Sequence, residues 1–540
     1  MSCEIFPPIS LHERNPAFLL FGNRLFNDQS PIEFLIEFLL VMNSSKRVGA
    51  DGKPFSSPLP DFEMLKGWRD PIGLLYAPQA RLNLKLFAFM GASRLDSRHE
   101  THREHYKELL ELLYGSIRVT EAGTEGDVLR TLENLFLGFQ GAGSGRTWCA
   151  QSFLPVCRGL LAGETIWSES TARRNAPREW NELFERGELQ KYFASNKHLF
   201  LARGGELLFL QLCNALRQSP ETIHAWAEQS DVCLEPSELN PAWLHAELQR
   251  ELGKLLDQCP QTLTEIADFL DSGVESETAH ATDRDHGGPR YVDAGWCAAE
   301  SWREGYLFAV ELLRLCTADL DIVKRLQLLE AACAMHVLRS LAAQSARHCR
   351  TERAVAWPGY RFAVSAPVED NPAVKRISRH TAKVAERLIH HALRSGDVTL
   401  PADSIQRDKI LREADRRYGG KLFTGLAKRI GLLVPRRGAG VRFTLNEQLL
   451  RLLVVTTVPV GGRLTYDRFK ALVEARHGLV VDGDGLARAD EWAGGTGRVS
   501  LGSQVDAWFQ DMLAAAGLLI HLSDACALVE NPAAKKGVNS

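Results

Sequence analysis

Apolar residues recur every three or four positions over most of the first 365 residues, which is the periodicity of helices with one buried face. The longest such stretch covers residues 321–348. Its apolar stripe consists of Ile322, Leu326, Leu329, Cys333, Val337 and Leu341. Because charged side chains lie mostly off this stripe, we expect an amphipathic helix that is central to packing. The pattern predicts a mainly α protein with a large helical body in residues 1–365.

Two polar stretches interrupt the helical pattern. Residues 271–293 are polar, acidic and glycine-containing, which predicts a loop that divides the body into two subdomains. Residues 350–372 contain three prolines, each of which restricts the residue before it to extended backbone. A domain boundary is therefore predicted near residue 365.

The segment that follows this boundary alternates between helical and strand-like spacing. The predicted elements are helices at 405–416 and 421–430, a break at Tyr418-Gly419-Gly420, and strands at 432–434 and 441–445 around a turn at 435–440. Helix, turn, helix and hairpin is the order of elements in a winged helix. Residues 366–445 are therefore predicted to form a basic winged-helix module.

A second segment repeats this order. The predicted elements are helices at 446–457, 465–477 and 503–516 and a hairpin of 518–521 with 527–529. Residues 446–531 are therefore predicted to form a second winged-helix-like module, and residues 532–540 a frayed tail. The tip of this hairpin carries Asp524 and no arginine, so this copy is expected to pack against protein.

Charge separates the basic module from the rest of the chain. Residues 371–442 contain 17 Lys and Arg against 6 Asp and Glu, a local charge of +11, whereas the whole chain has a formal charge of −3. The remaining residues therefore sum to −14. Such an asymmetry indicates a polyanionic partner if the basic segment folds.

In a winged helix the second helix enters the major groove and the hairpin tip lies along the DNA backbone. The predicted DNA-binding residues are Arg416, Arg417, Lys421, Lys428, Arg429, Arg436, Arg437 and Arg442. Double-stranded DNA is the predicted partner. The alternative is that these cations only keep a protein-binding module in solution. No side chain is singled out for reading base edges, so no specific DNA site is predicted.

The glycine-rich stretch 140–147 resembles a phosphate-binding loop at first sight. Gln140 stands where a P-loop has its first glycine, and Arg146 stands where it has lysine, so nucleotide binding is not predicted. Arg146, Thr147 and Gln151 remain candidates for a functional loop, and Trp148 is expected in the core. The grouped His280, Asp283, Asp285 and His286 are interpreted as a solvated acidic loop, not a metal site.

Composition and motifs favour a binding protein over an enzyme. The chain has 540 residues, 45% of them hydrophobic, and no apolar run near the roughly 20 residues of a membrane span. Neither a signal peptide nor a C-x-x-C pair is present in the sequence, so a cytoplasmic protein without membrane contact is expected. We predict no catalytic residue and no cofactor. Two alternatives stay open: a nuclease or nucleotide-dependent switch centred on residues 138–151, and a transcriptional regulator.

Three segments carry a resemblance to a bacterial family. They are residues 21–26 (FGNRLF), residues 146–151 (RTWCAQ), and residues 421–446 with 522–525. In these segments the chain resembles uncharacterised components of multi-gene antiphage defence systems, in particular those associated with DNA methylation. The resemblance implies a partner-dependent role, in which a helical adaptor recognises DNA while other defence proteins supply methylation, ATP hydrolysis or cleavage.

Overall fold

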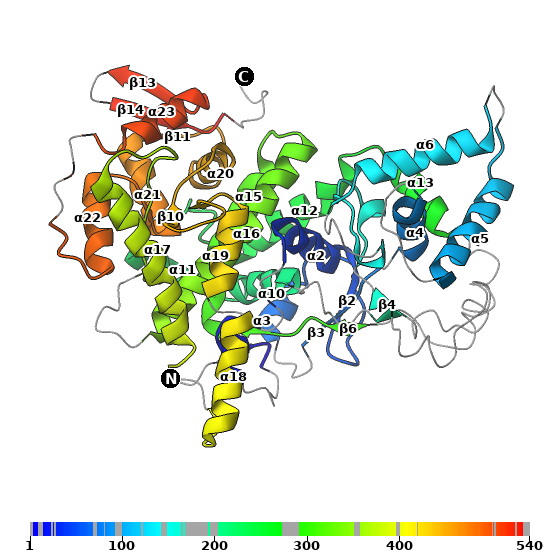
Figure 1. Ribbon diagram of the computed structural model, residues 1–540, viewed down its shortest axis with the longest axis horizontal. Helices are drawn as coiled ribbons and strands as arrows, with labels where there is room; N and C mark the ends of the chain where they lie inside the picture. The colour runs from blue at the N-terminus through cyan, green and yellow to red at the C-terminus, as the bar shows by residue number, and fades with distance from the viewer. Residues whose placement is uncertain are drawn as a thin grey trace.

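The computed structural model describes residues 4–8, 15–22, 25, 29–68, 73–79, 81–91, 100–119, 123–141, 148–163, 166–167, 193–194, 204–272, 291–349, 357–395, 400–417, 420–498, 501, 504–523 and 526–532. These residues are mainly helical, which confirms the prediction of a mainly α protein (Figure 1). None of the helices in these ranges is long and apolar enough to cross a bilayer.

The body consists of helices and a few short strands. Its helices are α1 (Pro16–Phe21), α2 (Pro31–Asn43), α3 (Phe62–Gly67), α4 (Leu82–Gly91), α5 (Glu100–Ser116), α6 (Glu125–Gly138), α10 (Gly204–Leu216), α11 (Pro220–Ser230), α12 (Pro241–Lys254), α13 (Gln261–Ser272), α15 (Trp302–Thr317) and α16 (Ile322–His348). Its strands are β1 (Ile5–Phe6), β2 (Ser45–Val48), β3 (Leu74–Ala77), β4 (Ile166–Trp167), β5 (Phe193–Ala194), β6 (Val292–Asp293) and β7 (Cys297–Ala298). Strands β2, β3 and β6 form an antiparallel sheet, and β1 pairs with β7 and β4 with β5.

Four helices, α2, α10, α15 and α16, form the centre of the body. Every residue of α10 is buried, and two glycines let its neighbours approach its backbone. A Cβ on Gly205 would lie 2.2 Å from the backbone nitrogen of Phe38 in α2. One on Gly305 of α15 would lie 2.3 Å from the carbonyl oxygen of Gln211 in α10. Larger residues at these positions would push the helices apart.

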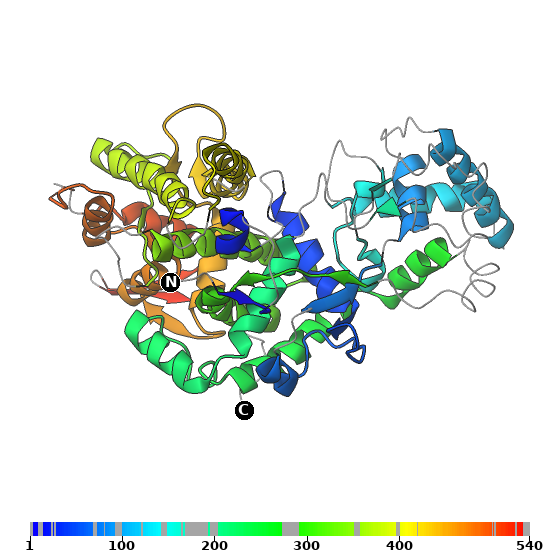
Figure 2. The same ribbon diagram turned by 90° about the horizontal axis from the view of Figure 1, so that it is seen from below.

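A lobe of α4, α5, α6 and α13 lies at one end of the molecule (Figures 1 and 2). The C-terminal residues lie at the opposite end. They form β8 (Phe362–Ala363), α17 (Pro372–Ala392), α18 (Ser404–Arg417), α19 (Gly420–Arg429), β9 (Leu433–Val434), β10 (Arg442–Phe443), α20 (Glu447–Thr457), β11 (Arg463–Thr465), α21 (Tyr466–His477), β12 (Leu479–Val480), α22 (Gly483–Trp492), α23 (Ala507–Ala515), β13 (Leu519–Ser523) and β14 (Cys526–Glu530).

The first C-terminal module, residues 366–445, contains three helices followed by the antiparallel β9–β10 hairpin. The predicted helices at 405–416 and 421–430 and the strands around 435–440 are confirmed within one or two residues at most ends. The second C-terminal module, residues 446–531, contains α20, α21 and α23 and the antiparallel sheet β11-β14-β13. Helix α22 and strand β12 are inserted between α21 and α23, and the apolar spacing did not predict either of them.

Both C-terminal modules pack directly on the body. Helix α16 contacts α17, α19 and α20, and one continuous hydrophobic core extends from Phe6 to Val529. Residues near the predicted boundary at 365 take part in this packing, since β8 pairs in parallel with β12 and Val364 bridges to Phe443 of β10. The segment therefore connects the two C-terminal modules to each other.

Two buried arginines hold the C-terminal end of α20 against the body. Arg314 of α15 donates to the carbonyl oxygens of Thr456 (2.9 Å) and Thr457 (2.8 Å) and pairs with Glu238 at 2.7 Å. Arg476 of α21 also donates to Thr456 (2.9 Å). Because a helix leaves its last carbonyls without partners, these arginines complete the hydrogen bonding of α20. They also fix the second module relative to α15.

Candidate functional site

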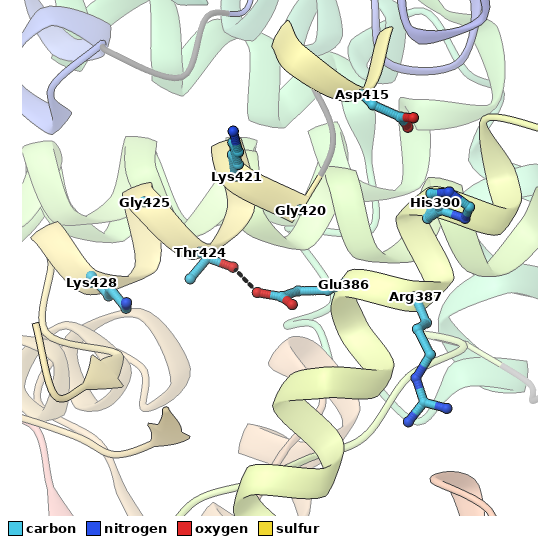
Figure 3. Close-up of a pocket in the computed structure, with 9 residues that line it drawn as sticks. All are labelled: Glu386, Arg387, His390, Asp415, Gly420, Lys421, Thr424, Gly425 and Lys428. Atoms are coloured by element: carbon cyan, nitrogen blue, oxygen red, sulfur yellow. Dashed lines mark hydrogen bonds between the residues drawn. The ribbon is translucent and has the colours of Figure 1, made fainter. Parts of the chain in front are cut away.

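An open cleft of about 790 Å³ lies between α17 and α19 of the first C-terminal module. It is lined by Glu386, Arg387 and His390 of α17, Asp415 of α18, and Gly420, Lys421, Thr424, Gly425 and Lys428 of α19 (Figure 3). The ionisable groups of the lining are more often basic than acidic.

The sequence of α19 explains how the cleft forms. Leu422, Phe423 and Leu426 are buried on one face of α19, which leaves Lys421, Thr424 and Lys428 nearer to solvent. A Cβ on Gly420 would lie 3.0 Å from Glu386 Cγ, so the absence of a side chain there lets α19 begin close to α17. Thr424 Oγ1 then donates to Glu386 Oε1 at 2.6 Å across the floor of the cleft (Figure 3).

Helix α17 presents a stripe of cations opposite its buried face. The buried face includes Val374, Ile377, Ala385 and Ile389, which pack on the body or on α22. The opposite stripe consists of Arg376, Arg379, Lys383, Arg387, His390 and Arg394, spaced three or four residues apart. A helix with this distribution turns its whole basic side to solvent.

The β9–β10 hairpin lies beside this stripe. Residues 435–440 of its tip, including Arg436 and Arg437, are all exposed. The Nε atom of Arg379 lies 3.4 Å from the position that a Cβ on Gly440 would occupy, so the tip begins next to α17. Gly440 has a φ of +81°, a conformation that favours glycine, and thereby closes the hairpin.

These elements together form a basic face. We define it as Arg379, Lys383, Arg387, Lys421, Lys428, Arg436 and Arg437. Among the residues that the structure describes, none of these seven side chains forms an ion pair with a carboxylate. Like charges that converge without counterions repel one another, which favours binding of an anionic ligand.

Two carboxylates moderate the charge of the cleft. Asp415 is paired with Arg394 at 2.6 Å, whereas within the described residues Glu386 accepts a hydrogen bond from the Thr424 hydroxyl. His390 lies between them on the α17 side (Figure 3). Partial burial lowers the pKa of His390, and the nearby Arg394 lowers it further.

Only some of the predicted DNA-binding residues belong to the basic face. Lys421, Lys428, Arg436 and Arg437 do, and Arg416 is exposed on α18. The side chain of Arg417 lies outside the described residues. The other two predicted residues are bound within the protein.

Arg429 donates to the carbonyl oxygen of Gln29, just before α2. Arg442 donates to Ser365 Oγ (2.5 Å) and to the carbonyl oxygens of Ala366 (2.7 Å) and Pro367 (2.7 Å). Both guanidinium groups donate to neutral oxygens of the protein, so each side chain is held in place by an internal contact.

The sequence prediction missed the three α17 members of the basic face, Arg379, Lys383 and Arg387. Their spacing of exactly four positions on one helical face was a detectable signal. The prediction followed the order of elements in a winged helix and therefore placed the DNA contacts on α18, α19 and the hairpin.

The loop that resembles a phosphate-binding site is described only in part. Arg146 and Thr147 lie outside the described residues. Trp148 is buried in the core, as predicted, and the buried Gln151 accepts a hydrogen bond from Gln140 Nε2 at 3.4 Å. The group around His280 also lies outside the described residues, and in the part of the chain that the structure covers no cluster of His, Cys, Asp or Glu is arranged to hold a metal.

Comparison with protein-family models, with curated proteins and with solved structures gives no match for this chain. Function must therefore be inferred from the basic face and the cleft within it.

Proposed function

We propose that this protein binds duplex DNA through its basic face and acts as a non-catalytic subunit of a bacterial antiphage defence complex. The observation that carries the DNA-binding part is the group of seven cations without carboxylate partners on α17, α19 and the hairpin tip. If each contacts one phosphate, the slope of log K against log [salt] would be about −6.

The arrangement of elements fits a winged helix that binds DNA. The order α17, α18, α19, β9, β10 has α19 in the position of a recognition helix and residues 435–440 in the position of a wing. Lys421 and Lys428 are two turns apart on one side of α19, about 10.5 Å along its axis. This separation is close to the roughly 12 Å width of the major groove.

The exposed side of α19 favours binding that does not depend on base sequence. The hydroxyl of Thr424 already donates a hydrogen bond to Glu386, and Gly425 has no side chain. Lysine acts as a point charge and lacks the forked donors with which arginine reads guanine. A transcriptional regulator would instead bind its own promoter far more tightly than random duplex, which a competition assay tests directly.

The deciding experiment is fluorescence anisotropy of the full chain with a 24-bp duplex over a salt series. The double variant Arg436→Glu/Arg437→Glu should reduce the salt slope by about two, because two phosphate contacts are lost. The matched control is Arg451→Glu/Arg463→Glu, which makes the same charge change at two exposed arginines that are paired with Glu447 and Glu530. Binding by the hairpin variant that equals that of the parent would refute the wing assignment, and stronger binding to duplex RNA would change the substrate class.

The defence-complex part of the proposal rests on the resemblance in residues 21–26, 146–151 and 421–446. Residues 1–370 contain 38 Lys and Arg against 50 Asp and Glu, a formal charge of −12, which makes the body unlike the basic module and suited to protein partners. Co-purification of the tagged chain with products of neighbouring genes tests this part. Metal-dependent nicking by the isolated chain, abolished by Arg146→Ala, would instead favour the nuclease alternative.

A further inference from the structure

The basic stripe of α17 is a ridge with a different element on each side. Helix α19 and the hairpin lie on one side, and α22 of the second module lies on the other (Figure 1). Val374 and Ile377 of α17 pack with Leu486 and Ala489 of α22, so the position of the inserted helix is fixed by apolar contact. The turn that follows α22 therefore lies next to the basic stripe of α17.

Helix α22 ends in a glycine-rich turn, residues 493–498, which is folded around one carboxylate. Asp490, only 2% exposed, accepts from the backbone nitrogen of Gly497 at 3.3 Å, and its own carbonyl accepts from Gly495 at 2.7 Å. A Cβ on Gly495 would lie 2.1 Å from Asp490 Oδ2, so only glycine fits there. Arg376 of α17 is 3.3 Å from the same carboxylate, and this ion pair joins the turn to the start of the stripe.

Arg498 in this turn differs from the other cations of its module. It is exposed and has no ion pair with any residue in the described ranges. The other Lys and Arg residues of the second module are engaged: Arg451, Arg463, Arg468, Lys470 and Arg488 in ion pairs and Arg476 with backbone carbonyls. Arg498 therefore lacks a carboxylate partner in these ranges, like the seven residues of the basic face. It follows α22, on the other side of α17 from α19 and the hairpin.

We propose that the turn 493–498 is a second contact for the backbone of the same DNA duplex. Arg498 would bind phosphate on the side of α17 opposite α19 and the hairpin, so that the duplex lies along the α17 ridge. The stripe from Arg376 to His390 is about 21 Å long, equivalent to roughly 6 bp. This inference rests on the proposed DNA binding. It adds a contact from the second module, whose own hairpin and α23 contain no Lys or Arg in the described residues.

The test compares Arg498→Glu with Arg451→Glu in the full chain, using the 24-bp duplex over a salt series. Both variants change the charge of the second module equally, but only the first removes the proposed contact. Arg498→Glu should reduce the salt slope by about one, and Arg451→Glu should leave it unchanged. A second measurement places the photo-crosslinking residue p-benzoylphenylalanine at position 496 or, as a control, at position 451.

DNA crosslinking from position 496 and not from position 451, together with the smaller salt slope, is the expected result. Equal slopes for the two arginine variants would overturn the inference. A smaller slope without crosslinking at position 496 would also overturn the inference. Arg498 would then act on the DNA through long-range electrostatics and not through direct contact. Failure of the parent chain to bind the duplex would be a separate result, which removes the proposed function itself.

Discussion

The two C-terminal modules handle their charges in opposite ways. In the second module, Arg463 is paired with Glu530, Arg488 with Glu474, and Lys470 with Asp506, so these cations stabilise contacts within the protein and Arg498 is the exception. In the first module, seven cations on α17, α19 and the hairpin tip have no carboxylate partner in the described residues. Both modules place helices before a hairpin, so the difference does not come from the order of elements.

The contrast shows which charges belong to the fold and which are available to a ligand. Unpaired like charges on one face raise the free energy of the folded state slightly, and a polyanion removes that repulsion when it binds. Loss of one partner of an ion pair costs most stability where both partners are buried, as at Arg314 and Glu238, because the remaining charge is left buried and uncompensated.

Loss of a buried partner should have the largest effect. Arg314→Met leaves Glu238 buried without its counterion and removes the arginine donor of the Thr457 carbonyl, whereas the Thr456 carbonyl keeps Arg476. We expect the free energy of unfolding, measured by chemical denaturation, to fall by about 3–5 kcal/mol. Arg314→Met/Glu238→Gln removes both charges and should recover part of this loss. Equal stability of Arg314→Met and the parent would contradict a structural role for the pair.

Charge reversal in the cleft should affect DNA affinity and leave stability unchanged. Lys421→Glu/Lys428→Glu should weaken duplex binding by about 100-fold at 0.1 M salt, because two phosphate contacts become repulsive. Anisotropy measures the affinity, and thermal unfolding of the same samples serves as the control for folding. A large fall in melting temperature with unchanged affinity would show that these lysines stabilise the fold and are not available to a ligand.

Duplex affinity should rise as pH falls through the titration of His390. Burial and Arg394 hold the pKa of this side chain below 6.5 in the free protein, and a neighbouring phosphate would raise it. A group whose pKa rises on binding adds affinity that is complete below its free pKa and lost above its bound pKa.

We therefore expect up to about tenfold tighter binding at pH 5.5 than at pH 7.5 for each unit of pKa increase. His390→Gln should remove this component of the pH dependence. The same substitution at the neighbouring histidine, His391→Gln, is the matched control. If both variants retain the full pH dependence, His390 does not face the DNA.

Removal of the acidic group in the cleft should have the smallest effect, with the opposite sign. Glu386→Gln keeps an oxygen to accept from Thr424 but removes a negative charge from the basic face. Duplex affinity should increase about threefold at 0.1 M salt, since one unfavourable charge near the phosphates is lost. Weaker binding by this variant would indicate that the carboxylate holds α19 in place through its charge.

Local patterns predicted the elements of the first module, but not which of its charges are free. The helical spacing of residues 405–416 and 421–430 and the intervening glycines were sufficient to place α18 and α19. In the sequence, however, Arg429 and Arg442 look the same as Arg436 and Arg437. Their partners, Gln29 and residues 365–367, are far away along the chain and become neighbours only through tertiary packing.

The missed helix α22 has a similar explanation. It begins with Gly483-Asp484-Gly485, a run that indicates a turn when only local propensity is considered. Asp482 caps it by accepting from the backbone nitrogen of Gly485 at 2.7 Å, and Leu486 and Ala489 pack against α17. Tertiary contact therefore stabilises a helix that its own residues favour weakly.

The attachment of α17, α19 and α20 to the single helix α16 fixes the basic face relative to the body. On a bound duplex, the α4–α6 lobe at the far end of the body would therefore project at one fixed angle around the DNA axis. Two copies on the same DNA would present their lobes to the same side only when separated by whole turns of about 10.5 bp. Phasing of the DNA helix would then govern which neighbouring copies can share one partner.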